Sequence, residues 1–359
     1  MEIDSQTASS TWAPFRLTPW FAERVWGFRD LHPWYDRVAG DDEPGSPATG
    51  PGRRGENPIG EAWLTGDQCL VATGVHAGQT LGALFSEAPE FLLGKAAPCS
   101  SEAAARCSKA APCNGSPLLI KVLFVKEKLS VQVHPDDALA QKFGEPCGKT
   151  ECWYVLEAEP GAQVACGLRP GVTLEDVKAG IETGTLESRL NMLSVAPGEM
   201  IFIDAGTVHA IWPGSILLET QQNCDLTYRM YDYGRGRELH IEKALQATKL
   251  VTHAGKIPPR TLGERTILME GYYFSVERVT VAGSRTSASL RGETEPDSGL
   301  QYLFVAGGAA RITGPGLEPL ELPMGGIAAV PAASPQFEVE DSGGLNLIRI
   351  TPRWPGTQR

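Results

Sequence analysis

The 359-residue sequence lacks the long apolar runs that mark membrane-spanning helices, since no stretch of 18 or more apolar residues occurs in it. Residues 1–12 are polar and include acids, so they lack the basic and apolar regions of a secretory signal. No two of the eight cysteines form a CxxC pair, and we expect reduced thiols in a cytoplasmic protein. These absences argue against a membrane protein and against a disulfide-stabilised secreted domain.

Positive charge is also scarce. The chain has 32 Lys and Arg residues against 43 Asp and Glu residues, which gives a formal net charge of −11 at pH 7. A globally acidic chain argues against a nucleic-acid partner. If the substrate is a phosphate ester, the binding site has to gather positive charge locally against this background.

Glycine and proline, by contrast, are plentiful, with 40 and 27 residues. Such frequent chain breakers favour many short strands joined by turns over long helices. The apolar share of 42% and the charged share of 21% are ordinary for a globular protein. We therefore expect a mainly β protein, with Pro/Gly-rich or small-residue loops at 39–58 and 96–117.

Hydrophobic patterning before residue 255 predicts strands and three helical regions. The strands lie at 118–125, 129–134, 151–158 and 163–168, within 194–203, and at 216–220 and 227–231. Residues 79–95 have apolar residues at helical spacing and predict one or two helices. Residues 173–193 and 239–251 also read as helical, and Thr173 is the expected N-cap of the former because acids follow it in the first turn.

The C-terminal part of the chain predicts a second, smaller β-barrel. Short strands separated by turns are expected at 272–279, 301–305, 326–330 and 345–350. This part contains no histidine, so we do not expect a metal site in it. The predicted domains are a catalytic domain at 1–255, with helical insertions at about 79–95 and 173–193, and a C-terminal β domain at 256–359.

The first chemically informative segment is the strand at 129–134. Alternation places Ser130, Gln132 and His134 on one face of this strand. Gln132 and His134 can each offer a lone pair to a divalent metal. A strand histidine that only hydrogen-bonds a neighbour remains the alternative.

Two further segments offer ligands. Lys149 and Glu151 share one face if a strand begins here, and Glu151 is a hard oxygen ligand with a cation beside it. The alternative is a surface ion pair at a strand end. His209 follows a tight turn at Gly206, and it is either a third inward-facing ligand or an ordinary loop histidine.

Glu219 lies in an apolar strand, where an unpaired carboxylate is expensive. Arg229 is its candidate partner, and a purely structural Glu–Arg pair is the alternative. Gln132, His134, Glu151 and His209 together form a mixed nitrogen and oxygen set. Such a set suits Zn²⁺ or a harder divalent ion, with one position left for substrate or water.

Several segments resemble the signature blocks of type I mannose-6-phosphate isomerases. The four main blocks are QVHPDD at 132–137, GKTECWY at 148–154, GTVHAI at 206–211 and QQNCDLTYRMYDYGR at 221–235. Weaker matches are Trp26 with Gly27, IGEAW at 59–63 and PLLIK at 117–121, and together the matches run from about residue 15 to 250. The sequence departs from the pattern at Phe28, where a second glycine is common.

The resemblance implies a cupin, or jelly-roll-like, β-barrel and a smaller cupin-like barrel after it. It implies a zinc site at Gln132, His134, Glu151 and His209. It further implies that Arg229 is the active-site arginine, that Lys149 lies near the substrate and that Glu219 is a pocket carboxylate.

The activity expected from the resemblance is interconversion of mannose 6-phosphate and fructose 6-phosphate through an enediolate. Ser130, Lys149 and Arg229 are the expected substrate-binding residues, and Arg229, Lys149 and Glu219 the expected catalytic ones. The general base stays open between Glu219, Lys149 and a metal-bound water. The alternatives are a cupin isomerase or epimerase for another sugar phosphate, a regulatory sugar-phosphate-binding cupin without catalysis, and a storage or structural cupin. The sequence leaves the oligomeric state open.

Overall fold

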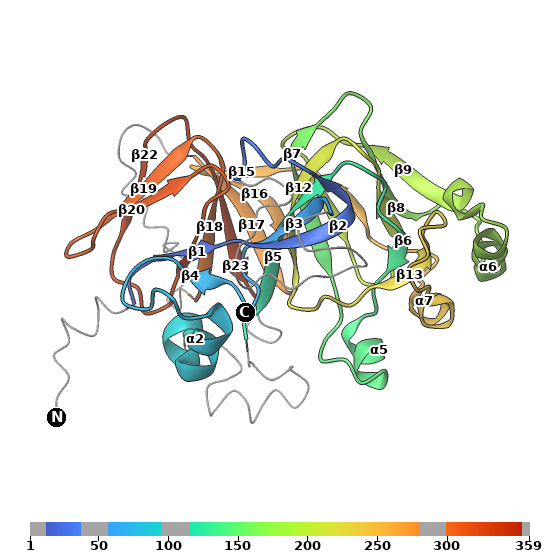
Figure 1. Cartoon of the computed structure of the whole chain (residues 1–359), viewed down its shortest axis with the longest axis horizontal. Helices are drawn as coiled ribbons and strands as arrows, with labels where there is room; N and C mark the ends of the chain where they lie inside the picture. The colour runs from blue at the N-terminus through green and yellow to red at the C-terminus, as the bar shows by residue number, and fades with distance from the viewer. Residues whose placement is uncertain (1–11, 37–56, 95–114, 281–298, 354–359) are drawn as a thin grey trace. The chain divides into compact units, whose positions relative to one another are not determined.

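The structure is a computed structural model that describes residues 12–36, 57–94, 115–280 and 299–353. Most of the loops predicted at 39–58 and 96–117 lie outside these residues. The chain divides into two compact units. The central unit consists of residues 21–63 and 118–258, and the terminal unit of residues 1–20, 64–117 and 259–359. Figure 1 labels their elements.

The central unit is built from two antiparallel sheets. The larger sheet has the order β14 (Gly255–Ile257), β10 (Met200–Ile203), β7 (Glu151–Ala158), β12 (Ser215–Gln222), β5 (Leu118–Val125), β3 (Ile59–Trp63) and β2 (Trp20–Phe28). The smaller sheet has the order β13 (Tyr228–Tyr231), β6 (Val131–Val133), β11 (His209–Ile211), β8 (Gln163–Leu168) and β9 (Leu190–Ser194). The predicted strands at 118–125, 151–158 and 163–168 are confirmed at both ends.

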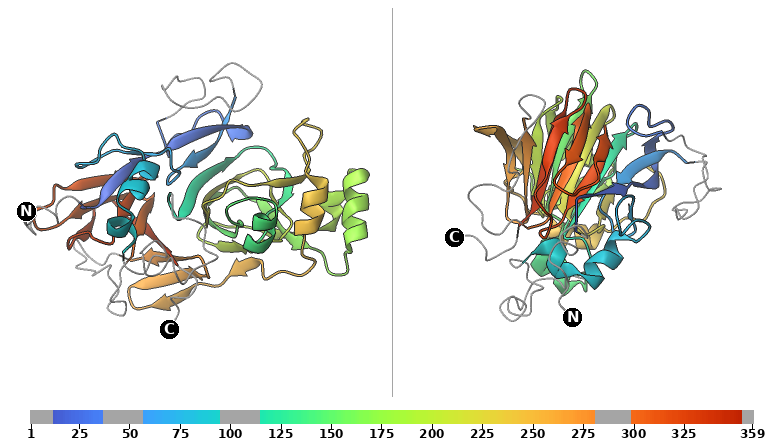
Figure 2. Two further views of the ribbon diagram at one scale, coloured as in Figure 1. Left: turned by 90° about the horizontal axis from the view of Figure 1, so that it is seen from below. Right: turned by 90° about the vertical axis from the view of Figure 1, so that its left-hand side faces the viewer.

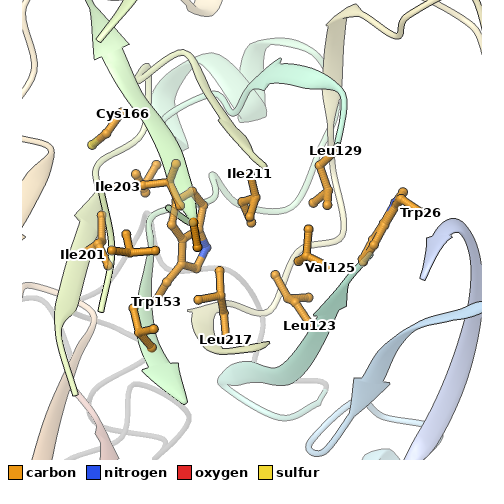
Figure 3. Close-up of a cluster of buried hydrophobic side chains, with 14 residues drawn as sticks. Trp26, Leu123, Val125, Leu129, Trp153, Cys166, Ile201, Ile203, Ile211 and Leu217 are labelled. Carbon is orange, nitrogen blue, oxygen red and sulfur yellow. The ribbon is translucent and has the colours of Figure 1, made fainter. Parts of the chain in front are cut away.

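The inner faces of these two sheets enclose an apolar core, part of which Figure 3 shows. Trp153 of β7 and Leu217 of β12 come from the larger sheet, whereas Cys166 of β8 and Ile211 of β11 come from the smaller one. Alternate residues of a strand face opposite sides of the sheet, so these inward positions recur at every second residue. The same inward rows carry the polar residues of the candidate site.

Among its described residues, the central unit has three helices, namely α5 (Asp137–Lys142), α6 (Leu174–Glu182) and α7 (Ile241–Ala247). Val177 of α6 and Ala244 of α7 pack in one cluster with Val131 and Val133 of β6. The two helices therefore cover the outer face of the smaller sheet, and Figure 2 shows them beside one another.

The expected N-cap of α6 is confirmed, because the Thr173 hydroxyl accepts from the Asp176 N–H and the Asp176 carboxylate accepts from the Thr173 N–H. The prediction of helix throughout 173–193 is wrong at its C-terminal end. A short 3₁₀ turn η1 (Leu186–Arg189) leads into β9, whose Met192 pairs with Ala165 of β8. Pairing with a strand distant in sequence overrides the local helical pattern there.

The terminal unit also contains two sheets and a core between them. The larger sheet has the order β15 (Arg260–Leu262), β16 (Arg265–Glu270), β17 (Phe274–Val279), β23 (Asn346–Pro352), β18 (Gln301–Gly307), β21 (Ile327–Val330), β1 (Phe15–Thr18) and β4 (Leu70–Val71). The smaller sheet has the order β20 (Leu320–Pro323), β19 (Ala309–Thr313) and β22 (Glu338–Asp341). Leu303 and Ala328 from one sheet pack with Ile312 and Leu322 from the other. The prediction of a mainly β protein with a second small barrel is confirmed.

The N-terminal part of the chain contributes to the terminal unit. Phe15 of β1 pairs with Ala329 of β21, and Leu17 pairs with Val71 of β4. Helices α2 (Leu81–Glu87) and α3 (Pro89–Leu93), which account for the predicted helical region at 79–95, fall in this unit as well. The predicted single boundary at residue 255 thus differs from the contact pattern, because strand pairing joins segments that are far apart in sequence.

None of the helices in the described residues is long and apolar enough to span a membrane.

Candidate metal centre

At one end of the central barrel the inward residues change from apolar to polar. On β7, Val155 and Trp153 are followed inward by Glu151, and on β12 Leu217 is followed by Glu219. Strand register sets Trp153, Glu219 and Lys121 opposite one another on β7, β12 and β5. Residues paired in this way project to the same face, so their polar groups converge inside the barrel.

The smaller sheet supplies a second polar row. His209 of β11 pairs with Gln132 of β6, and Gln132 also pairs with Arg229 of β13. The amide nitrogen of Gln132 lies 3.2 Å from Nε2 of His209. Gln132, His209 and Arg229 therefore lie on one face. Among the described residues, however, no ion pair joins Arg229 to the polar side chains of either row.

His134, Glu151 and His209 form a candidate metal-binding cluster, since one ligand atom from each lies within 4.8 Å of the others. Nε2 of His209 is 3.4 Å from one carboxylate oxygen of Glu151, and Nε2 of His134 is 3.7 Å from the other. The three side chains are at most 1% exposed. A buried set of two imidazoles and a carboxylate is the donor chemistry of a divalent transition metal.

Burial favours the neutral form of both imidazoles, and a backbone hydrogen bond orients His209 for ligation. Nδ1 of His209 lies 2.9 Å from the carbonyl oxygen of Thr207, to which it donates, and this leaves the lone pair on Nε2 facing Glu151. Burial lowers the pKa of His209 to about 4 and holds the pKa of His134 well below its usual value.

Lys149 places a positive charge among the ligand atoms. Its Nζ donates to Glu151 in a short contact and lies 3.2 Å from Nε2 of His134. Burial opposes the charged form, but the carboxylates of Glu151 and Glu219 outweigh it and raise the Lys149 pKa. The ammonium makes contacts that a bound cation would make, which indicates that the cluster is built to hold positive charge.

Glu219 has partners other than the one expected from the sequence. It accepts a 3.1 Å hydrogen bond from Nε1 of Trp153 and lies 3.9 Å from Nζ of Lys121 and 4.0 Å from Nζ of Lys149. The expectation of a Glu219–Arg229 pair was wrong, because register places Lys121 beside Glu219 on the neighbouring strand. Burial raises the pKa of Glu219, and the nearby carboxylates add to this effect against the two lysines.

Lys121 is a further residue of the site, and it was not predicted from the sequence. Its Nζ donates to Asp225 at 2.8 Å, lies 3.7 Å from Glu61 and sits 4.4 Å from the centre of the Trp63 ring. Every residue of β5 is buried, and Lys121 is its one charged residue. A charge in a buried strand needs partners, so Lys121 could have been identified from the sequence for the same reason as Glu219.

Arg24 and Trp63, which were also not predicted as site residues, donate hydrogen bonds to Glu61. Arg24 binds both carboxylate oxygens of Glu61, at 3.0 and 2.9 Å, and Nε1 of Trp63 donates to it at 2.6 Å. Burial alone would raise the pKa of Glu61, but Lys121 and Arg24 outweigh it and hold the pKa at about 2. Basic and acidic side chains thus alternate from Arg24 through Glu61, Lys121, Glu219 and Lys149 to Glu151.

The remaining sequence-predicted residues lie around this row. The Ser130 hydroxyl donates to the Gln132 side chain at 3.3 Å and is buried. Arg229 is partly exposed and donates from Nη1 to the Glu238 carbonyl at 2.8 Å. The structure therefore gathers Gln132, His134, Lys149, Glu151, His209 and Glu219 tightly and leaves Arg229 on the adjoining strand.

Comparisons with known proteins bear on this arrangement. Residues 15–160 match the family described as phosphomannose isomerase type I, catalytic domain. The mannose-6-phosphate isomerase ManA of Bacillus subtilis is 33% identical over 301 residues, which cover 78% of this chain and 82% of that protein. A crystal structure of the mannose 6-phosphate isomerase from Bacillus subtilis is similar, with a TM-score of 0.75 at 28% identity over 94% of this chain and 99% of that one. A mannose 6-phosphate isomerase bound with zinc and yttrium shares the fold, with a TM-score of 0.67 at 17% identity, and the alignment covers 95% of this chain and 100% of that one.

Proposed function

This chain belongs to the type I phosphomannose isomerase family, and on that premise we propose that it interconverts mannose 6-phosphate and fructose 6-phosphate. The observation that carries the proposal is the buried cluster of His134, Glu151 and His209, with Lys149 and Glu219 directly beside it. Family membership defines the reaction class, and this cluster supplies groups that such a reaction needs.

We propose that the cluster holds Zn²⁺, with Gln132 as the fourth protein ligand. The fit rests on neutral imidazoles, a buried carboxylate and a positive charge already held among them. Rotation of the Gln132 amide would present its oxygen in place of its nitrogen. When bound, the metal would polarise the substrate oxygens and stabilise negative charge developing on them.

Isomerisation moves one proton between C1 and C2 and another between the two oxygens, through an enediolate. A proton acceptor near neutral pH is needed for the carbon step. Lys121 and Lys149 are held as ammonium ions by the carboxylates around them, since these raise both pKa values against the effect of burial. The raised pKa of Glu219 lies closer to neutral pH than that of an ordinary carboxyl, which makes its carboxylate a stronger base. We therefore assign the proton transfer to Glu219.

The cations then serve as hydrogen-bond donors. Lys121 and Lys149 flank Glu219 at 3.9 and 4.0 Å, where they can stabilise oxyanion character next to the proton acceptor. We further propose that Arg229, which shares a face with Gln132, binds an anionic part of the substrate together with Ser130. These cations supply the local positive charge that a phosphate ester needs for binding to a chain whose net charge is −11.

The decisive experiment is a coupled assay for conversion of mannose 6-phosphate to fructose 6-phosphate with chelator treatment and zinc add-back. We expect activity to disappear with chelator and return with zinc, while metal analysis gives one zinc per chain. No turnover in zinc-loaded protein would overturn the assignment of this substrate. The same assay with other aldose phosphates then separates a different substrate from a regulatory binding role. The cytoplasmic location expected from the sequence stays a prediction.

A further inference from the structure

The ligands of the candidate metal cluster come from two different sheets. His134 directly follows β6 of the smaller sheet, whereas Glu151 is the first residue of β7 in the larger one. Within a sheet, the ladder of backbone hydrogen bonds fixes how side chains are spaced, but it does not fix the spacing between two sheets. The distance of 3.7 Å between Nε2 of His134 and the Glu151 carboxylate therefore depends on contacts outside the ladders.

Two stretches of backbone meet beside the cluster. The Gly148 N–H donates to Oδ1 of Asp137 at 2.8 Å, and the Lys149 N–H donates to the Pro135 carbonyl at 3.1 Å. The two stretches are packed so closely that a Cβ on Gly148 would lie 2.6 Å from the carbonyl carbon of Asp136. A side chain at Gly148 would push one stretch away, because the atoms that it would meet belong to the backbone and cannot turn aside.

Gln222 joins a third strand to this contact. Its Oε1 accepts from the Thr150 N–H at 2.9 Å, and its Nε2 donates to Oδ1 of Asp137 at the same distance. Gln222 is the last residue of β12, which pairs with β7, and it is buried. One oxygen of Asp137 thus accepts from both Gly148 and Gln222, and it connects the three segments.

We propose that Asp137 and Gln222 are positioning residues of the metal centre. They hold Glu151 at its distance from His134, and they keep the Lys149 ammonium beside both. Their action passes through the backbone of the stretch that leads into Glu151. Groups that orient ligands without binding the metal typically change metal affinity or activity by about 10- to 100-fold when they are removed. The inference rests on the proposed function, because it concerns the same metal and the same lysine.

The chemistry of the pair shows how it can be broken and repaired. Gln222→Glu keeps an acceptor for the Thr150 N–H but sets a second carboxylate against Asp137, so that attraction becomes repulsion. Combining it with Asp137→Asn exchanges the amide and the carboxylate. The amide introduced at 137 can donate to the carboxylate introduced at 222, and its oxygen still accepts from the Gly148 N–H. Recovery in the double variant therefore isolates the interaction between the two side chains.

The test measures kcat, KM and the visible absorption spectrum of the cobalt-loaded protein, since Co²⁺ reports on the arrangement of its ligands. In Gln222→Glu we expect kcat to fall by at least about tenfold and the cobalt spectrum to change. KM should stay within about twofold, because Arg229, the proposed anion contact, lies on β13 outside the three connected segments. The double variant should recover most of kcat and the spectrum of the parent. Gln141→Glu makes the same charge change at an exposed position of α5 and should leave all three unchanged.

A second substitution covers the case in which Gln222→Glu does not fold. Gln222→Met removes both hydrogen bonds without adding a charge, and the same losses are expected. Failure of both variants to fold would show that the role is structural, which contradicts the proposal.

The kcat and cobalt spectrum of the parent in a folded Gln222 variant would overturn the proposal. A double variant with the thermal stability of the parent but the kcat of Gln222→Glu would do the same, because the loss would then not pass through this pair. If the cobalt-loaded parent does not convert mannose 6-phosphate, the proposed function fails by itself. The spectra of the variants still decide whether Asp137 and Gln222 position the ligands.

Discussion

Lys121 of β5 and Glu61 of β3 lie 3.7 Å apart within a row of buried side chains whose charges alternate. Arg24 completes one end of this row through two hydrogen bonds to Glu61. The other end reaches Glu151 of the candidate metal cluster through Glu219 and Lys149. Each charge is compensated by its neighbours, so a change at one position is felt along the row.

Glu61→Gln tests the structural contribution of this row. The substitution keeps the shape but leaves Arg24 without its carboxylate and Lys121 with one anionic neighbour fewer. Removing one partner of a buried ion pair costs about 3 kcal/mol, and we expect the free energy of unfolding to fall by that order in a urea titration. Glu175→Gln, an exposed position on α6, is the control and should change it by less than about 0.5 kcal/mol.

The pH dependence of stability provides a second test of Glu61. Its pKa is about 2 in the folded protein and about 4.3 in an unfolded chain. Since the folded-state pKa is depressed, this contribution to stability is complete above the unfolded value and is lost as the pH falls towards 2. Between the two pKa values, the free energy of unfolding of Glu61→Gln should therefore fall less steeply with decreasing pH than that of the parent. Parallel acid curves for the two proteins would show that the pKa of Glu61 is not shifted on folding.

The proposed metal ligands predict that metal and activity are lost together. In Glu151→Ala or His209→Ala we expect zinc retention after gel filtration to drop below a tenth of the parent and turnover to fall with it, since three protein ligands remain. Metal analysis and the coupled assay measure the two effects. Stoichiometric zinc with full turnover in either variant contradicts the ligand assignment.

Arg229 is expected to behave differently from the ligands. Arg229→Ala should lower kcat/KM by about 100-fold, the loss of a charge-assisted contact to an anionic substrate, while zinc stays bound. Arg229→Lys should recover only part of this, because an ammonium lacks the planar fork of donors. Loss of zinc in Arg229→Ala would instead mean that the residue supports the strand that carries Gln132.

The position of Lys149 predicts that removing its charge strengthens zinc binding while it lowers activity. A cation entering the cluster has to displace the Lys149 ammonium from Glu151 and His134. Lys149→Met should therefore tighten zinc binding by at least about tenfold, since one like charge at about 4 Å contributes several kcal/mol at intermediate dielectric, while turnover falls. Competition with a chelating dye measures the affinity, with Lys178→Met, at an exposed position of α6, as control. Unchanged or weaker zinc binding would show that the ammonium does not compete with the metal.

Local sequence patterns proved reliable where one strand or one turn decides the structure. The strands at 151–158 and 163–168 have the predicted ends, and Thr173 caps its helix as expected. Local patterns failed where a distant partner intervenes. Residues 190–194 form β9 because they pair with β8, and the N-terminal strand β1 joins the sheet of the C-terminal half.

The sequence by itself determined the mainly β character, the shared strand face of Gln132 and His134, and the candidate ligand set. These features follow from periodicity and residue chemistry. Only the tertiary structure decided that Glu219 lies between Lys121 and Lys149 instead of beside Arg229. The physical reason is register. Which side chains face one another depends on how strands far apart in sequence align, and no local pattern encodes that alignment.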